Sequence, residues 1–327
     1  MPCTSTHALL AAVRRCHDAS TATPAHRHLP GSLTIAGNAA VPAVSAAGYS
    51  RAHMNVRDYV EANRRHWDEV ARLHPRTAFY QYHLERLRSG GTALHRLEID
   101  EVGDVAGKTL LHLQCHIGTE SVSWARLGAR VTAVDFSAGA IDEARRIASE
   151  LRVDVRFERA NIYELAGVVD GAFDIVYTSW GVLSWLPDLA AWARVVARHL
   201  KPGGVFYIAE FHPTPWIFDE FSEGLRVRYA YFPDGEPVMD ETPSSYADPD
   251  SNLENRRTYS WPYPLGQVVT SLIEAGLRIE LLHELPRCPY QMLPILVRDT
   301  TDDERWYRMP DGAPDLPLGF TLRALRD

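Results

Sequence analysis

The sequence predicts an α/β protein whose core is a doubly wound, mainly parallel sheet, and three observations support this fold. Between residues 108 and 213, five short apolar runs alternate with longer runs in which apolar residues recur every three or four positions. The first apolar run ends in a sharp turn that leads directly into a helix-like run. Polar residues follow all five runs, and the carboxyl ends of parallel strands share one edge of a sheet. That edge is therefore the predicted binding site.

Residues 1–53 differ in composition from the rest of the chain. They are rich in Ala, Ser, Thr, His and Pro, and they contain one acid, Asp18, against four arginines. Such a segment has no periodicity from which a packed core could form. We expect either a disordered extension or a non-native one, in which case Met54 is the true start, and a transit peptide is the alternative.

Residues 54–104 are predicted to form a helical cover. Side chains that include Val56, Val60, Trp67 and Val70 recur at spacings of three and four, as on one face of a helix. A second, short helix is expected over residues 92–102, because Gly90 and Gly91 precede this segment and Gly103 follows it. The cover is followed by a predicted binding core at residues 105–213.

Residues 108–118, KTLLHLQCHIG, are the stretch around which the fold is organised. Their pattern indicates a buried parallel strand whose carboxyl end turns sharply into a helix. The helix stops at Gly128, and the second strand-like run, RVTAV, is followed by Asp135. An acid that closes the second strand is suited to accept hydrogen bonds from both hydroxyls of a ribose.

These residues are similar to motif I of the class I S-adenosylmethionine (SAM) dependent methyltransferases, written acidic-x-Gly-x-Gly-x-Gly. His112 stands at the first acid, Gln114 and His116 at two of the glycines, and Gly118 at the last glycine. The chain resembles a bacterial branch with a His-Leu-Gln-Cys-His-x-Gly version of the loop. The resemblance implies a Rossmann-like seven-stranded sheet and SAM as the cofactor.

The resemblance also implies which residues contact the cofactor. From the first two strands these are Gln114, His116, Gly118, Asp135 and Phe136, with Gln114 or His116 reaching the methionine carboxylate.

The third strand, VDVRFERA, ends at Asn161 and Ile162, where the family usually has an acid that bonds the adenine amino group. Asn161 can still accept that bond through its amide oxygen. Ser179 and Trp180, at the end of the fourth strand FDIVYTS, are also expected to contact the cofactor. In the family an amino-terminal helix covers the cofactor, so we also expect Trp67 and Tyr80 near the sulfonium, with core packing as the alternative for Trp67.

The remaining elements of the core follow from local signals. Ser137 can cap a helix over residues 138–151, and Pro187 and Asp188 open the helix before residue 200. The turn KPGG then leads into the fifth strand, VFYIAEF.

Residues 214–263 interrupt the alternation with many aromatic residues, prolines and acids. This aromatic-rich insertion after the fifth strand is a predicted substrate lid, and a surface excursion or an oligomer contact is the alternative. Residues 264–327 are expected to form a helix, the strand LRIELLHEL, a long loop and a last strand, PLGFTLRALR. By resemblance, these two strands form the antiparallel hairpin that closes the sheet.

Composition excludes several classes of protein. The chain has 327 residues, 46% of them hydrophobic, and no apolar run of 18 residues that would span a membrane. A net charge of −8 without a Lys/Arg cluster argues against nucleic-acid binding. Cys3, Cys16, Cys115 and Cys288 show no CxxC spacing, which favours a reducing cytoplasm. We expect a cytoplasmic monomer or homodimer that acts on a small molecule, without a membrane partner or a metal.

The predicted chemistry is in-line transfer of the SAM methyl group to an oxygen or nitrogen atom of a metabolite. SAM carries an activated methyl group, so the protein has mainly to align the acceptor and exclude water. His212, after the fifth strand, is the candidate general base, and Glu210 is a second candidate. The alternative for His212 is a structural role in the turn before Pro213. Cys115 is expected to be a small buried hydrophobe.

Two other functions are weighed against methyl transfer. A nicotinamide-dependent oxidoreductase is disfavoured because only Gly118 of a GxGxxG loop is present. The second alternative is a SAM-binding protein without transfer activity, and only a measurement of turnover would distinguish it from a methyltransferase.

Overall fold

The computed structural model describes residues 55–301 and 303–327, so the expectations for residues 1–53 and for a start at Met54 lie outside the described residues. Its main sheet has seven strands in the order β3-β2-β1-β4-β5-β12-β8. Strands β1 to β5 are parallel to one another, whereas β12 is antiparallel to both β5 and β8. The predicted doubly wound seven-stranded α/β fold is confirmed.

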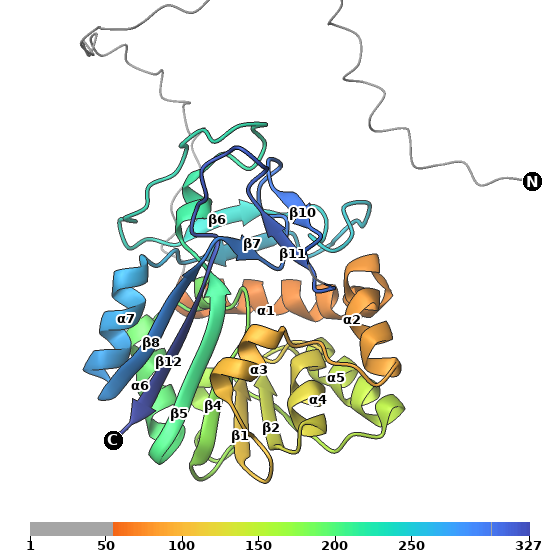
Figure 1. Ribbon diagram of the computed structural model, residues 1–327, viewed down its shortest axis with the longest axis vertical. Helices are drawn as coiled ribbons and strands as arrows, with labels where there is room; N and C mark the ends of the chain where they lie inside the picture. Colours follow the sequence, from red (N-terminus) through yellow and green to blue (C-terminus); the bar gives the residue numbers. More distant parts are fainter. Residues whose placement is uncertain (1–54, 302) are drawn as a thin grey trace, which may run out of the picture. The chain divides into compact units, whose positions relative to one another are not determined.

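The amino-terminal cover consists of three α-helices: α1 (Val56–Leu73), α2 (Ala78–Arg88) and α3 (Arg96–Val102). Asn55 caps α1 in a capping box with Asp58, which satisfies amide groups that the first turn leaves free. The predicted helix over 92–102 begins only at Arg96, because the residues before it form a turn. Figure 1 shows α1 lying across the upper ends of the strands.

The parallel strands alternate with helices as expected. The strands are β1 (Thr109–Leu113), β2 (Arg130–Asp135), β3 (Arg156–Arg159), β4 (Phe173–Thr178) and β5 (Leu200–Phe211). The helices are α4 (Thr119–Arg126), α5 (Ala138–Leu151) and α6 (Leu189–His199). Ser137 and Asp188 cap α5 and α6 through their side chains, as their sequence positions predict.

The carboxyl-terminal elements are α7 (Leu265–Glu274), β8 (Leu277–Leu285) and β12 (Gly319–Arg326). They close the sheet as the predicted antiparallel pair. The long loop expected between these strands contains a small sheet of β9 (Arg287–Cys288), β10 (Val297–Asp299) and β11 (Trp306–Arg308). Strands of two or three residues are too short to show a period of two, so the sequence pattern missed them.

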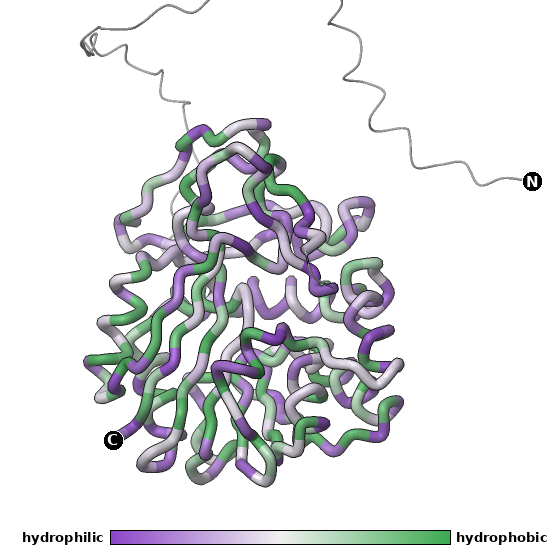
Figure 2. The backbone as a smooth tube through the Cα atoms, in the orientation of Figure 1, coloured by the Kyte–Doolittle hydropathy of each residue, from purple (hydrophilic) through white to green (hydrophobic). Residues whose placement is uncertain are grey.

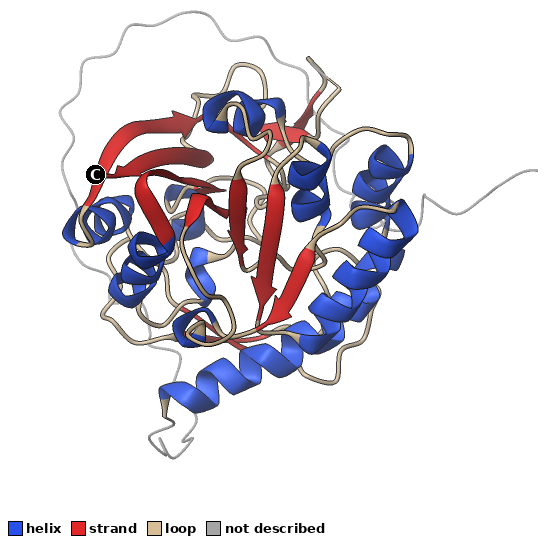
Figure 3. Ribbon diagram, turned by 90° about the horizontal axis from the view of Figure 1, so that it is seen from below, coloured by secondary structure: helices blue, strands red, loops and turns tan. Residues whose placement is uncertain are grey.

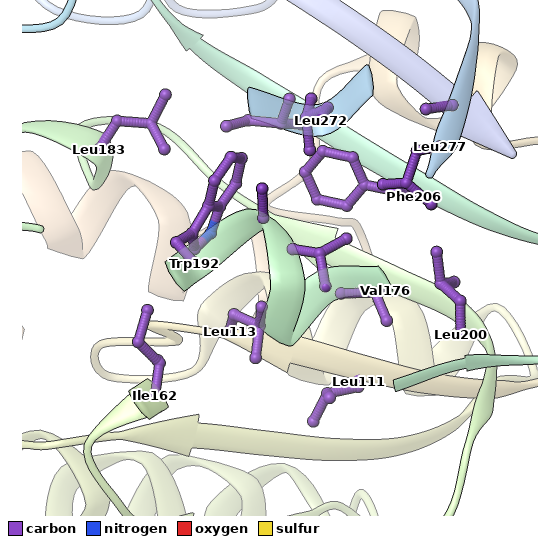
Figure 4. Close-up of a cluster of buried hydrophobic side chains, with 14 of the residues drawn as sticks. Leu111, Leu113, Ile162, Val176, Leu183, Trp192, Leu200, Phe206, Leu272 and Leu277 are labelled. Carbon is purple, nitrogen blue, oxygen red and sulfur yellow. The ribbon is translucent and has the colours of Figure 1, made fainter. Parts of the chain in front are cut away.

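The sheet is covered by helices on both faces (Figure 3), and a separate core fills each side. On one face, α6 and α7 pack against the strands, and Figure 4 shows Trp192 and Leu272 beside Phe206 and Val176. On the other face, α3, α4 and α5 enclose a core that contains Trp124, Tyr177 and Tyr207. Figure 2 shows hydrophobic residues recurring along the strands and helices of this region.

Residues 214–263 form an irregular segment with one hairpin, β6 (Val238–Glu241) and β7 (Arg257–Ser260). Its middle part is largely exposed, with Phe221 80% and Phe232 77% exposed. Its end packs on α1, where β7 makes many contacts. The insertion is therefore held at one end by the amino-terminal cover.

Helix α1 approaches α5 so closely that the contact requires glycine. A Cβ atom added to Gly139 would lie 2.4 Å from the carbonyl oxygen of Asp68, closer than real Cβ contacts. The Asp68 carboxylate accepts hydrogen bonds from the Ser137 hydroxyl and the Gly139 amide at 2.8 and 3.2 Å. Together these contacts fix α1 over the start of α5.

Gly139→Ala should destabilise the fold by about 1–3 kcal/mol, because the added methyl group must push α1 away from α5. Gly266→Ala in α7 is the matched control, since an added Cβ meets no atom within 4 Å there; it should be neutral or stabilising by about 0.4–1 kcal/mol. Urea denaturation measures both. Equal free energies of unfolding for the two variants would contradict the predicted clash.

Candidate active site

The turn after β1 has a left-handed backbone at three alternate positions. Gln114 has φ 58°, His116 has φ 49° and Gly118 has φ 75°. These are the positions of the three glycines in motif I. The left-handed conformation costs a residue with a Cβ about 1–2 kcal/mol. Contacts elsewhere in the fold must therefore stabilise this conformation at Gln114 and His116.

Gly118 cannot be replaced in the same way. A Cβ at this residue would lie 2.7 Å from the Phe157 ring and 3.0 Å from Ala144. Gly118 is also the N-cap of α4, so the helix begins immediately after the turn. The amide groups of the first turn of α4 are therefore directed towards the site.

Asp135 connects the turn with the end of β2. Its carboxylate accepts hydrogen bonds from the His116 amide and the Ser137 amide, both at 2.9 Å. Burial raises the pKa of the Asp135 carboxyl to about 6, although the two amides oppose the shift. The carboxylate is thus held at the rim of the sheet, and each oxygen retains a lone pair for a ligand.

His112 replaces the first acid of motif I and has a structural role. Its Nδ1 lies 2.7 Å from the Ser121 hydroxyl, and its Nε2 lies 3.2 Å from the Ser179 hydroxyl. The ring therefore links β1 to α4 and to the end of β4. Burial lowers the pKa of His112 to about 3, so the imidazole is neutral. Ser179 is in this way placed next to the turn.

The end of β3 is close to the rim as predicted. Asn161 caps a short 3-10 helix by accepting a hydrogen bond from the Tyr163 amide, and its amide oxygen has a second lone pair. Ile162 is buried in the core beside α6. Phe136, directly after Asp135, is half-buried.

Trp67 and Tyr80 do reach the turn, through rings that contact His116. The ring centroid of Trp67 lies 5.4 Å from that of His116 and 5.2 Å from that of Trp185. The Tyr80 ring lies 5.5 Å from His116 and stacks on His74 at 4.5 Å. Helices α1 and α2 thus bring an aromatic wall to the turn.

His74, which the sequence reasoning did not single out, connects this wall to the insertion. Its Nδ1 lies 2.8 Å from His116 Nε2, and its Nε2 lies 2.9 Å from the Ser245 hydroxyl. The phenol oxygens of Tyr80 and Tyr246 are 2.5 Å apart. Burial lowers the pKa of both imidazoles, that of His116 to about 3, so they form a neutral pair.

Helix α1 also binds the backbone of the insertion. The Asn63 side chain donates to the Tyr259 carbonyl at 2.7 Å and accepts from the Tyr259 amide at 2.8 Å. The Glu69 carboxylate accepts from the amides of Glu254 and Asn255, each at 2.8 Å. These contacts hold residues 254–259 against the cover.

Two predicted site residues are placed elsewhere. Trp180 packs against Trp306 and Phe211, with ring centroids 5.9 and 5.6 Å away. His212 is buried, accepts from the Thr214 amide, and has its Nε2 3.0 Å from a Glu284 carboxylate oxygen on β8. The side chains of Trp180 and His212 are thus positioned by contacts that do not involve the turn after β1. A role for His212 as the general base stays a prediction.

Glu210 is a structural anchor. Its buried carboxylate accepts from the amides of Gly181, Val182 and Leu183 at 2.6, 2.8 and 3.0 Å, which fixes the loop after β4. That loop in turn accepts a hydrogen bond from the Gln114 side chain at the Val182 carbonyl. The remaining oxygen, Gln114 Oε1, is buried and has no hydrogen-bond partner among the described residues.

Glu120 is a second residue that the sequence reasoning missed. It lies in the first turn of α4, two residues after Gly118, and its Oε2 accepts from the Thr119 hydroxyl at 2.9 Å. Burial raises the pKa of the Glu120 carboxyl to about 7. The sequence offers a signal for this residue, because an acid follows the last glycine of the turn by two positions.

A groove of about 1100 Å³ lies beside the short helix at Asn161. Its lining includes Tyr163 and Asp188, from the short helix after β3 and the start of α6, and Phe232 and Trp261 from the insertion. Within residues 55–301 and 303–327, no group of three or more His, Cys, Asp or Glu side chains is arranged to hold a metal ion. No helix in the same ranges is long and apolar enough to cross a membrane.

The chain is similar in sequence to known methyltransferases. A family model described as a methyltransferase domain matches residues 110–204. The ubiquinone biosynthesis O-methyltransferase of Xanthomonas oryzae pv. oryzae is 37% identical over 129 residues, which is 38% of this chain and 54% of that protein. The chain thus spans about half the length of that relative.

A longer match is to the demethylmenaquinone methyltransferase of Beutenbergia cavernae. It is 31% identical over 183 residues, which is 56% of this chain and 71% of that protein. Among solved structures, a putative S-adenosylmethionine dependent methyltransferase from Listeria monocytogenes has a TM-score of 0.49 at 20% identity, covering 71% of this chain and 97% of that chain.

Asn63→Ala should destabilise the protein by about 1–3 kcal/mol, because it removes two buried hydrogen bonds between α1 and the insertion. Residues 254–259 should also exchange their amide hydrogens faster. The control is Asn252→Ala, on the exposed surface of the insertion, with an expected change within about 0.5 kcal/mol. Unchanged exchange in Asn63→Ala would show that α1 does not hold the insertion.

Proposed function

The chain belongs to the class I SAM-dependent methyltransferase family, and we propose that it transfers the methyl group of SAM to an oxygen or nitrogen atom of a small molecule. The observation that carries the proposal is the left-handed turn at residues 114–118, held by the Asp135 carboxylate at the sheet rim. We place the chain in the branch whose loop reads His-Leu-Gln-Cys-His-x-Gly.

The adenosine half of the cofactor is assigned to the ends of β2 and β3. The Asp135 carboxylate accepts from the ribose hydroxyls, because it is buried at the rim and each oxygen has a free lone pair. Phe136 lies beside it. Asn161 accepts from the adenine amino group, and the Ile162 amide faces the ring. Ser179, at the end of β4 beside His112, is also assigned to the cofactor.

The methionine half is assigned to the turn itself. Gln114 donates one of its two Nε2 hydrogens to the Val182 carbonyl, and its Oε1 is a buried acceptor without a hydrogen-bond partner among the described residues. An acceptor suits the ammonium group of the methionine half and not its carboxylate. This refines the expectation that Gln114 or His116 contacts the carboxylate, and leaves that role to His116.

We assign His116 as a hydrogen-bond donor from the contacts of His74. In this assignment Ser245 Oγ accepts from the Ala247 amide at 3.1 Å and donates its own hydrogen to His74 Nε2 at 2.9 Å. His74 Nδ1 then carries hydrogen and donates to His116 Nε2. In this tautomer His116 Nδ1 carries hydrogen, which suits a carboxylate.

The cofactor supplies a sulfonium methyl group that is already activated for transfer. The residues of this chain therefore bind, orient and exclude water. Trp67 and Tyr80 place aromatic rings beside the turn, where a sulfonium gains about 0.5–2 kcal/mol from a ring face. The insertion closes the site through Ser245 and Tyr246 and is our proposed substrate lid.

The acceptor is proposed to be a small molecule. One relative is named as a ubiquinone biosynthesis O-methyltransferase and another as a demethylmenaquinone methyltransferase, and the aromatic wall suits a ring-bearing acceptor. The net charge of −8 makes a nucleic-acid acceptor electrostatically unfavourable. Cytoplasmic location and a monomeric or homodimeric state are part of the same proposal.

Turnover with methyl-labelled SAM tests the proposed activity. We expect labelled product from a panel of catechols, hydroquinones and primary amines, measured by scintillation after extraction. If SAM binds by calorimetry but no panel member or metabolite extract yields labelled product, the chain is a SAM-binding protein without transfer activity. Absence of SAM binding would remove the cofactor assignment itself.

Asp135→Asn should weaken SAM binding at pH 8 by about tenfold or more, because a charged hydrogen-bond acceptor becomes neutral. In the wild type the ionised carboxylate binds the hydroxyls, so affinity should fall as pH decreases below about 6, where Asp135 is protonated. The variant should lose this pH dependence. Calorimetry from pH 5 to 8 measures both effects.

Asp154→Asn, on an exposed position before β3, is the control and should match the wild type. The ribose assignment fails if Asp135→Asn folds normally and binds SAM as tightly as the control.

A further inference from the structure

Arg305, in the segment that precedes β11, is held against helix α2. Its guanidinium carbon lies 4.9 Å from the centroid of the Phe79 ring and 5.2 Å from the centroid of the Tyr82 ring. Its Nη1 donates a hydrogen bond to the Phe79 carbonyl at 3.2 Å. Two ring faces and one hydrogen bond thus fix the orientation of a long, positively charged side chain.

The Arg305 side chain keeps unused hydrogen-bond donors. Its Nε and Nη2 lie on one edge of the guanidinium, and two such N–H groups can bind a carboxylate through parallel hydrogen bonds. Neither atom donates a hydrogen bond within residues 55–301 and 303–327, and neither is among the buried polar atoms without a partner, so this edge is accessible. No carboxylate in the same ranges forms an ion pair with Arg305.

A second arginine makes the region more positive. The Arg86 guanidinium lies 5.6 Å from the centroid of the same Tyr82 ring, and its Nη1 donates to the Tyr82 hydroxyl and the Asp303 carbonyl at 2.9 and 3.3 Å. Arg86, too, forms no ion pair with a carboxylate of the described chain. Burial lowers the pKa of the neighbouring His83 to about 3, and the charges of both arginines lower it further, so this imidazole is neutral.

The acids of the adjoining segment do not neutralise the two arginines. The Glu304 carboxylate accepts from the Arg96 amide and the Trp306 indole at 2.7 and 2.8 Å, and it lies 3.2 Å from His95. The Asp303 carboxylate forms no hydrogen bond or ion pair with the residues that the structure describes. Acids outnumber Lys and Arg by 42 to 34 in this chain, so two neighbouring arginines without an acidic partner are unusual. An anionic ligand would relieve the repulsion between their charges.

A series of aromatic rings connects Arg305 with the cofactor turn. The Phe79 ring that carries Arg305 lies 5.9 Å from the Tyr246 ring and 6.2 Å from the Tyr290 ring, and the last two are 5.5 Å apart. Phe79, Tyr246 and Tyr290 are termed the outer cluster. Tyr246 also lies 5.0 Å from His74, the residue that contacts the turn. Because Tyr246 is 42% exposed, a ligand can reach the outer cluster from solvent.

From these contacts we infer that Arg305 binds a carboxylate of the methyl acceptor, which is an aromatic acid whose ring packs on the outer cluster. This inference rests on the proposed methyltransferase function and specifies the charge of its substrate. A neutral phenol would pack on the same rings but would leave the donors of Arg305 to water. Arg86 adds a second positive charge that attracts the anion. The carboxylate lies at the end of the outer cluster remote from the turn, so the methylated end of the acceptor lies towards the turn.

Calorimetry on the full chain tests the inference without turnover. S-adenosylhomocysteine binding is measured first for the wild type, Arg305→Gln and Arg194→Gln, which removes an exposed arginine from α6. All three proteins should bind it equally, because Arg305 contacts α2 and not the turn. Absence of binding in the wild type would contradict the proposed function itself. Loss confined to Arg305→Gln would assign Arg305 to the cofactor and overturn the present inference alone.

The loaded proteins are then titrated with 4-hydroxyphenylacetate and with its neutral counterpart, 4-hydroxyphenylacetamide. At neutral pH the wild type and Arg194→Gln should bind the acid about tenfold or more tightly than the amide. Arg305→Gln should lose this preference, and Arg305→Lys should retain only part of it, because an ammonium cannot form the bidentate contact. An acid that binds no more tightly than the amide, or an unchanged preference in Arg305→Gln, overturns the inference.

The position of the aromatic ring is tested with Tyr290→Ala. This variant should bind both probes about fivefold more weakly, because it removes a ring contact and no charge. The ratio of the two affinities should stay that of the wild type. If both affinities are unchanged, the ring does not lie on the outer cluster and the inference fails.

The wild type alone provides a further readout if Arg305→Gln fails to fold. Sodium chloride at about 0.5 M should weaken binding of the acid several-fold and change binding of the amide little, because salt screens charged contacts. Inorganic phosphate, titrated separately, should bind about tenfold more weakly than the aromatic acid, because it has no ring to pack on the outer cluster. Equal salt dependence for the acid and the amide would contradict the inference, as would phosphate that binds as tightly as the acid.

Discussion

The hydrogen bond from the His116 amide to the Asp135 carboxylate is the contact on which the site depends. It joins the turn after β1 to the end of β2, and the same carboxylate accepts from the Ser137 amide at the start of α5. The turn after β1, the end of β2 and the start of α5 are thereby fixed at one point. The left-handed backbone at Gln114 and His116 persists because this network and the packing of Gly118 against Phe157 over-determine the turn.

Helix α1 serves as a second organiser, since its side chains contact three separate parts of the protein. Asp68 binds the start of α5, Trp67 packs on His116, and Asn63 and Glu69 bind the backbone of the insertion. These residues lie within two turns of one helix. A rigid element thus couples the turn, the predicted ribose acid and the predicted lid, so movement of α1 would alter all three together.

The electrostatics of the site follow from burial more than from paired charges. Burial raises the pKa of the Asp135 and Glu120 carboxyls and lowers that of His116. Arginines and lysines are paired mainly at the surface, as in the Lys201–Asp174 contact. The region around the turn thus has acidic and aromatic groups but neutral imidazoles. Such a site complements positively charged groups, a sulfonium or an ammonium.

The sequence by itself determined the sheet, the caps Ser137 and Asp188, and the positions of the turn and Asp135, because these depend on local periodicity and on short-range hydrogen bonds. Only the tertiary structure decided which side chains meet there. His74 and Ser245 are 171 residues apart in the sequence, yet their side chains form a hydrogen bond, and the other ring nitrogen of His74 contacts His116. The short strands of the carboxyl-terminal loop and the role of Glu210 as an amide anchor likewise arise from distant packing, which no local pattern encodes.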